Sequence, residues 1–435
     1  HDFYDELTEL KEIYAWFSPA GPRPQRRETP GAYPLSLSMP LAAADHGHAA
    51  IEAFLWGLLP DNERILAAWA RRFQVSARSA FALIAEVGED CAGAVQFVRP
   101  ERRDALLSAR ASEVEWLTEA DVAARLRDLR ADPSLWRGTS DAGQFSLAGA
   151  QPKTALLLDR GRWGVPSGRT PTTHILKPPS GDLDGHAENE HLCLALARAL
   201  GLPAARSEVR RFEDETAIMV ERYDRVRASG AVRRVHQEDL CQALGVHPAK
   251  KYQNEGGPSP REMIELLRAN VRGEPSDDAV NTFAVNETAT PFMVTDMNTF
   301  LGALIFNWLI GGTDAHAKNY SLLIGAGGSV RLAPLYDLAS ILAYPQIDPR
   351  KAKLAMKVGD EYRLSNIGAA EWRKLAAEVR TDGDALILRA RAMASELPDR
   401  LNDEAGKLRK AGLKHRIVGN LTSTLTERAR RLASF

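Results

Sequence analysis

The sequence predicts an α+β fold with two lobes, a mixed α/β N-terminal lobe followed by a mostly helical C-terminal lobe. Strand-like runs and one helix alternate between residues 154 and 221, whereas helical periodicity dominates residues 226–435. The chain of 435 residues is also longer than a single hydrophobic core usually supports, which is about 250–300 residues. We therefore expect more than one packed unit.

Residues 1–132 are expected to form an N-terminal subdomain with one strand and a helical block. Apolar side chains alternate with serines from residue 33 to residue 41, which predicts a half-buried strand. Residues 1–30 show no pattern that supports a function. Apolar faces and capping residues predict helices at 54–59, 61–73, 76–88 and 118–132.

A change of composition to Pro, Ser, Gly and Thr after residue 132 predicts a domain boundary. Residues 133–225 are expected to form the mixed lobe, and residues 226–435 the helical lobe. Within the mixed lobe, we expect strands at 154–158, 172–176 and 216–221 and a helix at 188–200. Many α+β proteins share this layout, so the layout alone predicts no function.

The overall composition limits which binding partners and which cellular compartment we expect for the protein. A net charge of −1 and a pI near 6.9 give no overall attraction to nucleic acid, so a DNA contact would need a local patch or a partner. The three cysteines lie far apart without a Cys-x-x-Cys pair, which indicates buried thiols in a reduced compartment. Without a long apolar run or a signal pattern, we expect a cytoplasmic protein with no membrane contact.

A tight polar loop follows an apolar helix within residues 306–320. It carries Asp314 and Asn319, which have the spacing that a kinase catalytic loop uses. In phosphoryl transfer, a carboxylate orients the attacking hydroxyl and an amide oxygen ligates magnesium. We therefore predict that Asp314 is the catalytic base and that Asn319 is a metal ligand, although a helix-capping loop could have the same short pattern. His316 and Lys318 are further catalytic candidates, with a structural hydrogen bond as the alternative for His316.

Three more residues complete this constellation. Asp337 is an isolated acid in the apolar, strand-like segment 335–340, where it fits a second magnesium ligand or an ordinary turn. Lys177 ends a strand-like run, and Glu190 lies thirteen residues later on the predicted helix. A strand lysine that is oriented by a helix glutamate clamps ATP phosphates in kinases. The alternative for Lys177 is a solvated strand end.

Small residues surround one glycine in the segment 145–155, which leads into a strand. Such a loop allows backbone N–H groups to approach phosphates. The segment matches neither Gly-x-Gly-x-x-Gly nor the P-loop pattern, so generic rules give only a weak prediction.

Six segments, in this order along the chain, together resemble the HipA family of serine/threonine kinases, the toxins of bacterial toxin–antitoxin pairs. They are residues 146–153, 172–177, 220–225, 237–242, 251–257 and 307–322. The resemblance spans roughly residues 30–430 and implies a two-lobed protein-kinase-like fold. Residues 1–30 and 277–295 depart from the family pattern, which puts partner contacts and substrate choice in doubt.

The resemblance implies roles for individual residues and two cofactors, ATP and Mg²⁺. Asp314 matches the catalytic aspartate, and Asn319 and Asp337 match the magnesium ligands. Ser146 matches the serine that family members phosphorylate on themselves, which would expel the loop and switch the kinase off; a turn serine is the alternative. The candidates for nucleotide contact are Ala148, Gly149, Ala150, Gln151, Lys153, Lys177, Glu190, Glu221, Tyr223 and Gln237, of which Glu221 and Tyr223 match the adenine-binding hinge.

The resemblance also implies partners. The family antitoxin is a dimeric, HipB-like helix-turn-helix protein that ties the toxin to operator DNA, so contact with DNA is expected only through that partner. The family substrates are aminoacyl-tRNA synthetases. Two other functions stay open from the sequence: a kinase-shaped corepressor in which catalysis is secondary, and a small-molecule phosphotransferase that shares the spacing of Asp314 and Asn319.

Overall fold

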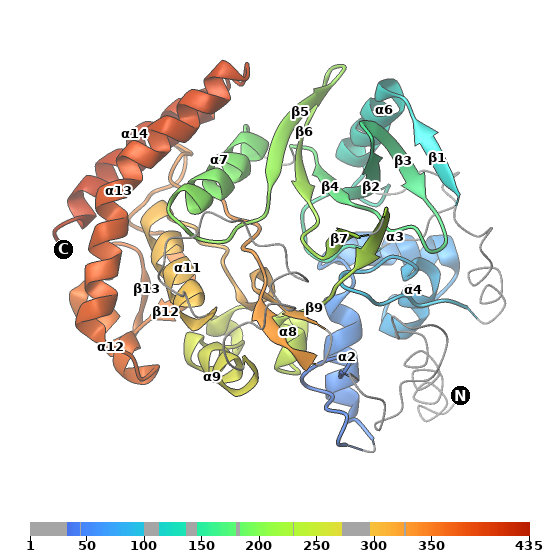
Figure 1. Cartoon of the computed structure of the whole chain (residues 1–435), viewed down its shortest axis with the longest axis horizontal. Coiled ribbons are helices and arrows are strands. Elements are labelled where there is room, and N and C mark those ends of the chain that lie inside the picture. The colour runs from blue at the N-terminus through green and yellow to red at the C-terminus, as the bar shows by residue number, and fades with distance from the viewer. Residues whose placement is uncertain are drawn as a thin grey trace.

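The computed structural model describes residues 33–43, 45–99, 113–135, 146–179, 183–228, 230–271, 296–325 and 328–435. Within them, helices and antiparallel sheets form the predicted α+β fold, with the sheet-containing N-terminal part beside a C-terminal lobe of long helices (Figure 1). Residues 1–30 and 277–295, which depart from the family pattern, lie outside the described residues.

The N-terminal helical block forms as predicted. It contains α2 (His48–Gly57), α3 (Glu63–Phe73) and α4 (Ala80–Val87). Side-chain oxygens cap two of these helices, because Asn62 accepts from the backbone N–H of Ile65 and Ser79 accepts from that of Ala82. The apolar faces of the block share one core, to which Phe54, Leu58, Leu59, Trp69 and Leu83 contribute fully buried side chains.

The prediction of a strand at residues 33–41 is wrong. This segment is a turn closed by an isolated bridge between Ser36 and Met39. The backbone N–H of Leu37 donates to the buried Glu238 carboxylate at 2.9 Å, and the Ser38 hydroxyl donates to the Gln242 carbonyl at 2.8 Å. These distant polar partners determine the conformation, and the local alternation of side chains cannot reveal them.

A six-stranded antiparallel sheet forms the N-terminal lobe, in the order β1-β3-β2-β4-β6-β5. Its strands are β1 (Val114–Leu117), β2 (Thr154–Asp159), β3 (Arg162–Pro166), β4 (His174–Lys177), β5 (Ser207–Phe212) and β6 (Glu215–Glu221). Two helices, α6 (Glu119–Ala131) and α7 (His186–Ala199), cover its faces. Ala217 and Met219 of β6 pack in one core with α6, whereas Ile218 and Val220 pack with α7, so the two helices lie on opposite faces.

The C-terminal lobe is built on α11 (Asp296–Ile310), which is buried around nearly all of its circumference. The other long elements of the lobe are α9 (Pro260–Asn270), α12 (Ala369–Glu378), α13 (Gly383–Lys410) and α14 (Arg416–Leu432). Trp308 of α11 meets Trp372 of α12 edge to face, with ring centroids 5.5 Å apart. Among the described helices, none is both long and apolar enough to cross a membrane.

Short strands also occur after residue 225, where the sequence predicts mainly helix. They are β7 (Arg225–Ala228), β8 (Ala231–Arg234), β9 (His236–Asp239), β10 (Ser321–Ile324), β11 (Val330–Leu332), β12 (Lys353–Val358) and β13 (Glu361–Arg363). In the sheet β11-β10-β9, strand β10 begins directly after the segment that carries Asp314, and α8 (Leu240–Ala243) continues from β9. These strands are three to six residues long, too short to give a clear period-two pattern.

A buried charge cluster joins the N-terminal subdomain to the chain that leaves β6. It consists of Asp90, Arg222, Asp224, Arg225 and Arg234, and we call it the Asp90 cluster. Asp90 accepts from Arg225 at 2.9 Å and from Arg234 at 3.1 Å, and Asp224 accepts from Arg222 and Arg225 at 2.9 and 2.8 Å. Burial alone would raise the pKa of Asp90, but the charges of its arginines hold that pKa well below its usual range.

Replacing Asp90 by Ala is expected to lower the free energy of unfolding by about 3–5 kcal/mol, because it leaves Asp224 as the one carboxylate of the cluster for its three arginines. Urea denaturation followed by tryptophan fluorescence measures the loss. Asp214→Ala is the matched control, since Asp214 pairs with Arg127 on the surface, and this change should have little effect. Equal effects of the two substitutions would contradict the structural role of the Asp90 cluster.

Candidate active site

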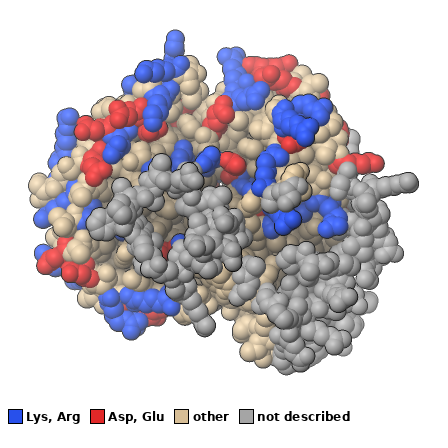
Figure 2. All heavy atoms as spheres, in the orientation of Figure 1, with Lys and Arg blue, Asp and Glu red and all other residues tan. Residues whose placement is uncertain are grey.

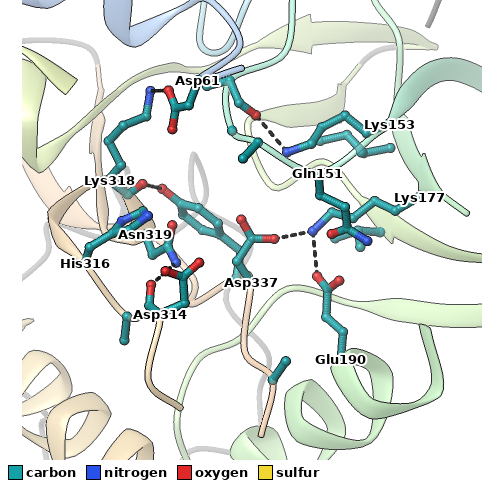
Figure 3. A pocket seen from close by; sticks show the side chains of 18 of the residues that line it. Asp61, Gln151, Lys153, Lys177, Glu190, Asp314, His316, Lys318, Asn319 and Asp337 are labelled. Carbon is teal, nitrogen blue, oxygen red and sulfur yellow. Dashed lines mark hydrogen bonds and ion pairs between the residues drawn. The ribbon is translucent and has the colours of Figure 1, made fainter. Parts of the chain in front are cut away.

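A cavity of about 590 Å³ lies between the two lobes. Residues from β4, β6, α7 and the loops of the C-terminal lobe line it (Figure 3). Almost all of the residues predicted from the sequence meet there: Ala148, Gly149, Ala150, Gln151, Lys153, Lys177, Glu190, Glu221, Tyr223, Gln237, Asp314, His316, Lys318, Asn319 and Asp337. Four stretches that are far apart in the sequence therefore converge on one space.

Lys177 is buried at the end of β4, so it is not a solvated strand end. Its ammonium is 2.7 Å from Glu190 Oε1 on α7, and it also pairs with the carboxylate of Asp337. Burial would lower the pKa of Lys177, but the Asp337 and Glu190 carboxylates raise it above its usual range. Lys177 thus carries a fixed positive charge at the cavity.

Asp337 lies in a loop after β11, and the strand-like conformation expected for its segment is wrong. Its φ is +52°, in the left-handed region that non-glycine residues rarely adopt. Burial would raise the pKa of Asp337, but Lys177 and Lys153 hold that pKa well below its usual range. The hydroxyl of the preceding Tyr336 donates to the Lys318 carbonyl at 2.6 Å, which ties this loop to the loop of Asp314. The sequence analysis did not identify Tyr336.

Two glycines end α11 and shape the loop that holds Asp314. Gly311 has a φ of +68°, and a Cβ at Gly312 would lie 2.2 Å from Asn307 Oδ1, so side chains are excluded at both positions. The Asn319 side-chain N–H group donates to the Asp314 backbone carbonyl at 2.8 Å. Because that bond uses the amide nitrogen, the amide oxygen of Asn319 stays available as a ligand.

His316 and Lys318 lie in the same loop and differ in their surroundings. Burial lowers the pKa of His316 to about 4, so the ring is neutral at pH 7. Lys318 is buried, and its ammonium lies 3.0 Å from Asp61 Oδ1 and 3.8 Å from Asp239 Oδ2. These contacts make Lys318 part of an ion-pair group, and its catalytic role stays a prediction.

The segment from Ala148 to Lys153 forms a tight loop over the cavity. The φ of Gly149 is +101°, and the Lys153 ammonium donates to the Ala148 carbonyl at 2.7 Å. Burial lowers the pKa of Lys153 to about 8. Ser146 does not line the cavity, because it is fully buried and donates to the Leu58 carbonyl at 2.7 Å.

Glu221, Tyr223 and Gln237 also line the cavity. The backbone N–H of Glu221 already donates to the Arg206 carbonyl at 2.9 Å, so it cannot also bind a base. Tyr223 packs against Tyr336 with ring centroids 5.8 Å apart. Gln237 Oε1 is buried and has no hydrogen-bond partner within the described residues, which makes it available to a bound molecule.

Asp61, the first residue of the helix predicted at 61–73, is a site residue that the sequence analysis did not identify. It lies between α2 and α3, and its carboxylate also pairs with Lys251 at 2.8 Å. Its backbone N–H donates to the Gly149 carbonyl at 3.3 Å. The N-terminal subdomain therefore contacts both the Ala148–Lys153 loop and the Asp314 loop through one residue. Local sequence patterns carry no signal for contacts over such separations.

A cleft between a sheet lobe and a helical lobe, with a buried lysine–glutamate pair and an aspartate loop, defines a protein kinase. The chain belongs to the HipA family within that class. The family model described as "HipA-like C-terminal domain" matches residues 145–402, and the model "HipA N-terminal domain" matches residues 23–98.

Individual relatives agree with this assignment. The chain is 39% identical to the putative kinase Y4mE of Sinorhizobium fredii, over 79% of this chain and 76% of that protein. It is 32% identical to the serine/threonine-protein kinase toxin HipA of Shewanella oneidensis, over 78% and 73% of the two chains. The solved complex of Shewanella HipA, HipB and operator DNA matches with a TM-score of 0.69 and 27% identity, over 93% of this chain and 90% of that one.

The Asp61 carboxylate should make stability depend on pH in the acid range. Burial would raise the pKa of Asp61, but Lys318 and Lys251 lower it to about 2, below the ordinary value of 3.8. The group therefore stabilises the fold fully above about pH 4, and this contribution, about 2 kcal/mol, is lost as the pH falls towards 2. Urea denaturation of wild type and Asp61→Asn across this range measures it. Parallel pH dependences for the two proteins would contradict the ion pairs.

Proposed function

We propose that this HipA-family kinase uses Mg²⁺-ATP to phosphorylate serine or threonine in a protein, and that it is the toxin of a toxin–antitoxin pair. The observation that carries the proposal is the convergence of Lys177, Asp314, Asn319 and Asp337 on one cavity. A cation for the phosphates, a base for the acceptor and oxygen ligands for a metal are the parts that phosphoryl transfer needs.

The charges and donors of the cavity fit a nucleotide triphosphate. Lys177 and Lys153 supply positive charge, and the backbone of the Gly149 loop allows close approach of phosphate oxygens. The Asp337 carboxylate and the Asn319 amide oxygen are hard ligands, and Mg²⁺ typically takes one or two such groups together with water and phosphate oxygens. Phosphate oxygens can replace Asp337 beside Lys177, which frees that carboxylate for the metal.

Asp314 then orients the acceptor. Its carboxylate accepts the proton of the serine or threonine hydroxyl as the bond from that oxygen to the γ-phosphorus forms, and the bond from phosphorus to the ADP oxygen breaks, with its electron pair leaving on ADP. Bound Mg²⁺ would neutralise negative charge on the phosphates. Most of the catalysis arises from position and charge, which explains why so many side chains here are paired and buried.

The proposed partners follow from the relatives. The solved Shewanella HipA is in a complex with HipB and operator DNA, which supports a HipB-like helix-turn-helix antitoxin for this chain. On the face in Figure 2, basic and acidic side chains of the described residues are interspersed, which supports contact with DNA through the antitoxin. An aminoacyl-tRNA synthetase is the proposed substrate. The same complex favours a second candidate, a corepressor in which catalysis is secondary.

Ser146 is the proposed site of self-phosphorylation. Its hydroxyl is bonded to Leu58 in the interior, so the loop must leave this position before the serine can be modified. A phosphate of about two negative charges could not return to an apolar site next to a carbonyl. The modified loop would therefore stay outside the cavity, and nucleotide binding would be lost.

Asp314→Asn is expected to lower phosphate transfer by about 10²–10⁴-fold, because the amide cannot accept the acceptor proton in the same way. Transfer of label from γ-³²P-ATP to the protein itself and to purified synthetases measures the effect. Asp348→Asn, a carboxylate in an ion pair outside the cavity, is the control and should retain activity. If wild type transfers no label, and Asp314→Asn still supports operator binding with the antitoxin, the corepressor function is favoured instead.

Asp337→Ala should remove the dependence of nucleotide binding on magnesium. Of the two proposed metal ligands, Asp337 and Asn319, Asp337 is the charged one, and this change deletes it. Wild type should bind ATP at least about tenfold more weakly when EDTA removes the metal, since the ion links the phosphates to this carboxylate. Calorimetric titration with and without Mg²⁺ measures both dissociation constants. A variant that keeps the full magnesium effect would rule out Asp337 as a ligand.

A further inference from the structure

The segment 250–257 lies against the Asp314 loop, and the proposed function uses none of its residues. It continues from η2 (Pro248–Lys250) and contains η3 (Gln253–Glu255). Within it, residues 251–257, Lys-Tyr-Gln-Asn-Glu-Gly-Gly, are one of the segments that resemble the HipA family. Two of its side chains contact residues of the active site: Lys251 pairs with Asp61, and Tyr252 contacts Asp314.

The Tyr252 hydroxyl donates to Asp314 Oδ1 at 2.5 Å, a short hydrogen bond to a carboxylate. The Tyr252 ring stands edge-on to His316, with ring centroids 4.9 Å apart and an interplanar angle of 87°. Burial, and after it the charge of Asp314, raise the pKa of Tyr252 above its ordinary value. The phenol therefore keeps its proton at neutral pH and acts as a donor.

Contacts on both sides hold Tyr252 in place. Its carbonyl accepts from the Gly257 N–H at 2.9 Å, and a Cβ at Gly257 would lie 2.0 Å from the Lys250 carbonyl oxygen, so the turn requires glycine there. Next to it, Gln253 Oε1 accepts from the backbone N–H of Lys357 on β12 at 2.7 Å. The turn that carries the phenol is thus fixed to the C-terminal lobe.

Lys251 adds an anchor on the other side of Tyr252. Its ammonium pairs with Asp61 at 2.8 Å, and its carbonyl accepts from the Ala317 N–H at 3.3 Å. The backbone of the segment is therefore bonded directly to the loop that holds Asp314. The position of the phenol relative to the carboxylate is set by these bonds, and not by the phenol contact alone.

We propose that Tyr252 is a positioning residue for phosphoryl transfer, which holds Oδ1 of Asp314 and so directs Oδ2 to the acceptor hydroxyl. The inference rests on the proposed kinase function. An aspartate side chain can rotate about two bonds, and a base acts only when its oxygen lies within hydrogen-bond reach of the proton. A donor that is fixed independently removes that freedom before the acceptor arrives.

The opposite interpretation is that the phenol occupies the place of an acceptor and blocks the base. Such a blocking group must leave when the acceptor binds, whereas the segment of Tyr252 is bonded to Ala317, Lys357 and Asp61. Tyr252 also does not line the cavity that contains Asp314. The contacts therefore favour orientation over competition.

Tyr252→Phe tests the proposal, since it removes one oxygen and keeps the ring beside His316. The assay uses full-length chain, Mg²⁺-ATP, and the inactive Asp314→Ala chain as the acceptor. We expect kcat to fall about tenfold, part of the general-base contribution. The KM for ATP and the dissociation constant for the nucleotide should stay at the wild-type values, because no nucleotide contact changes. A purely structural defect would alter binding as well.

Tyr362→Phe is the matched control, because it removes a phenol oxygen from β13, outside the cavity and the Asp314 loop. It should leave kcat unchanged. A wild-type or higher kcat for Tyr252→Phe overturns the proposal, and so does phosphate found on Tyr252 of the wild type, which would make the phenol an acceptor. An inactive wild type would overturn the kinase function itself, so the two failures are distinguishable.

Discussion

The active site depends on the ion pairs of the buried Lys177 ammonium. A lysine in this position would be costly without counter-ions, and Glu190 and Asp337 supply them from α7 and from the loop after β11. The pairing brings the N-terminal lobe and the C-terminal lobe to the same point. It also keeps Asp337 ionised, so one contact prepares both the proposed phosphate clamp and the proposed metal ligand.

Much of the site could be predicted from the sequence, because its parts are local. The spacing of Asp314 and Asn319 is fixed within one loop, and Lys177 and Glu190 are only 13 residues apart. Strand β2 and helices α3 and α7 also follow their apolar patterns closely. In these cases the signal and the structure lie within about twenty residues of each other.

The features that the sequence did not reveal depend on distant partners. The turn at residues 33–41 is determined by Glu238 and Gln242, which lie about two hundred residues away. Asp61 gains its role only when Lys251 and Lys318 reach it, and Tyr252 gains its role from Asp314. Propensity and periodicity describe single segments, so they cannot show such pairs.

During translation, Asp61 is synthesised well before the residues that neutralise its carboxylate. Its two cationic partners follow 190 residues and more further along the chain, and a ribosome releases the N-terminal subdomain first. Lys251 is the first of these partners to emerge, and the second, Lys318, follows only with the loop that carries Asp314. The catalytic centre can therefore assemble only late in translation.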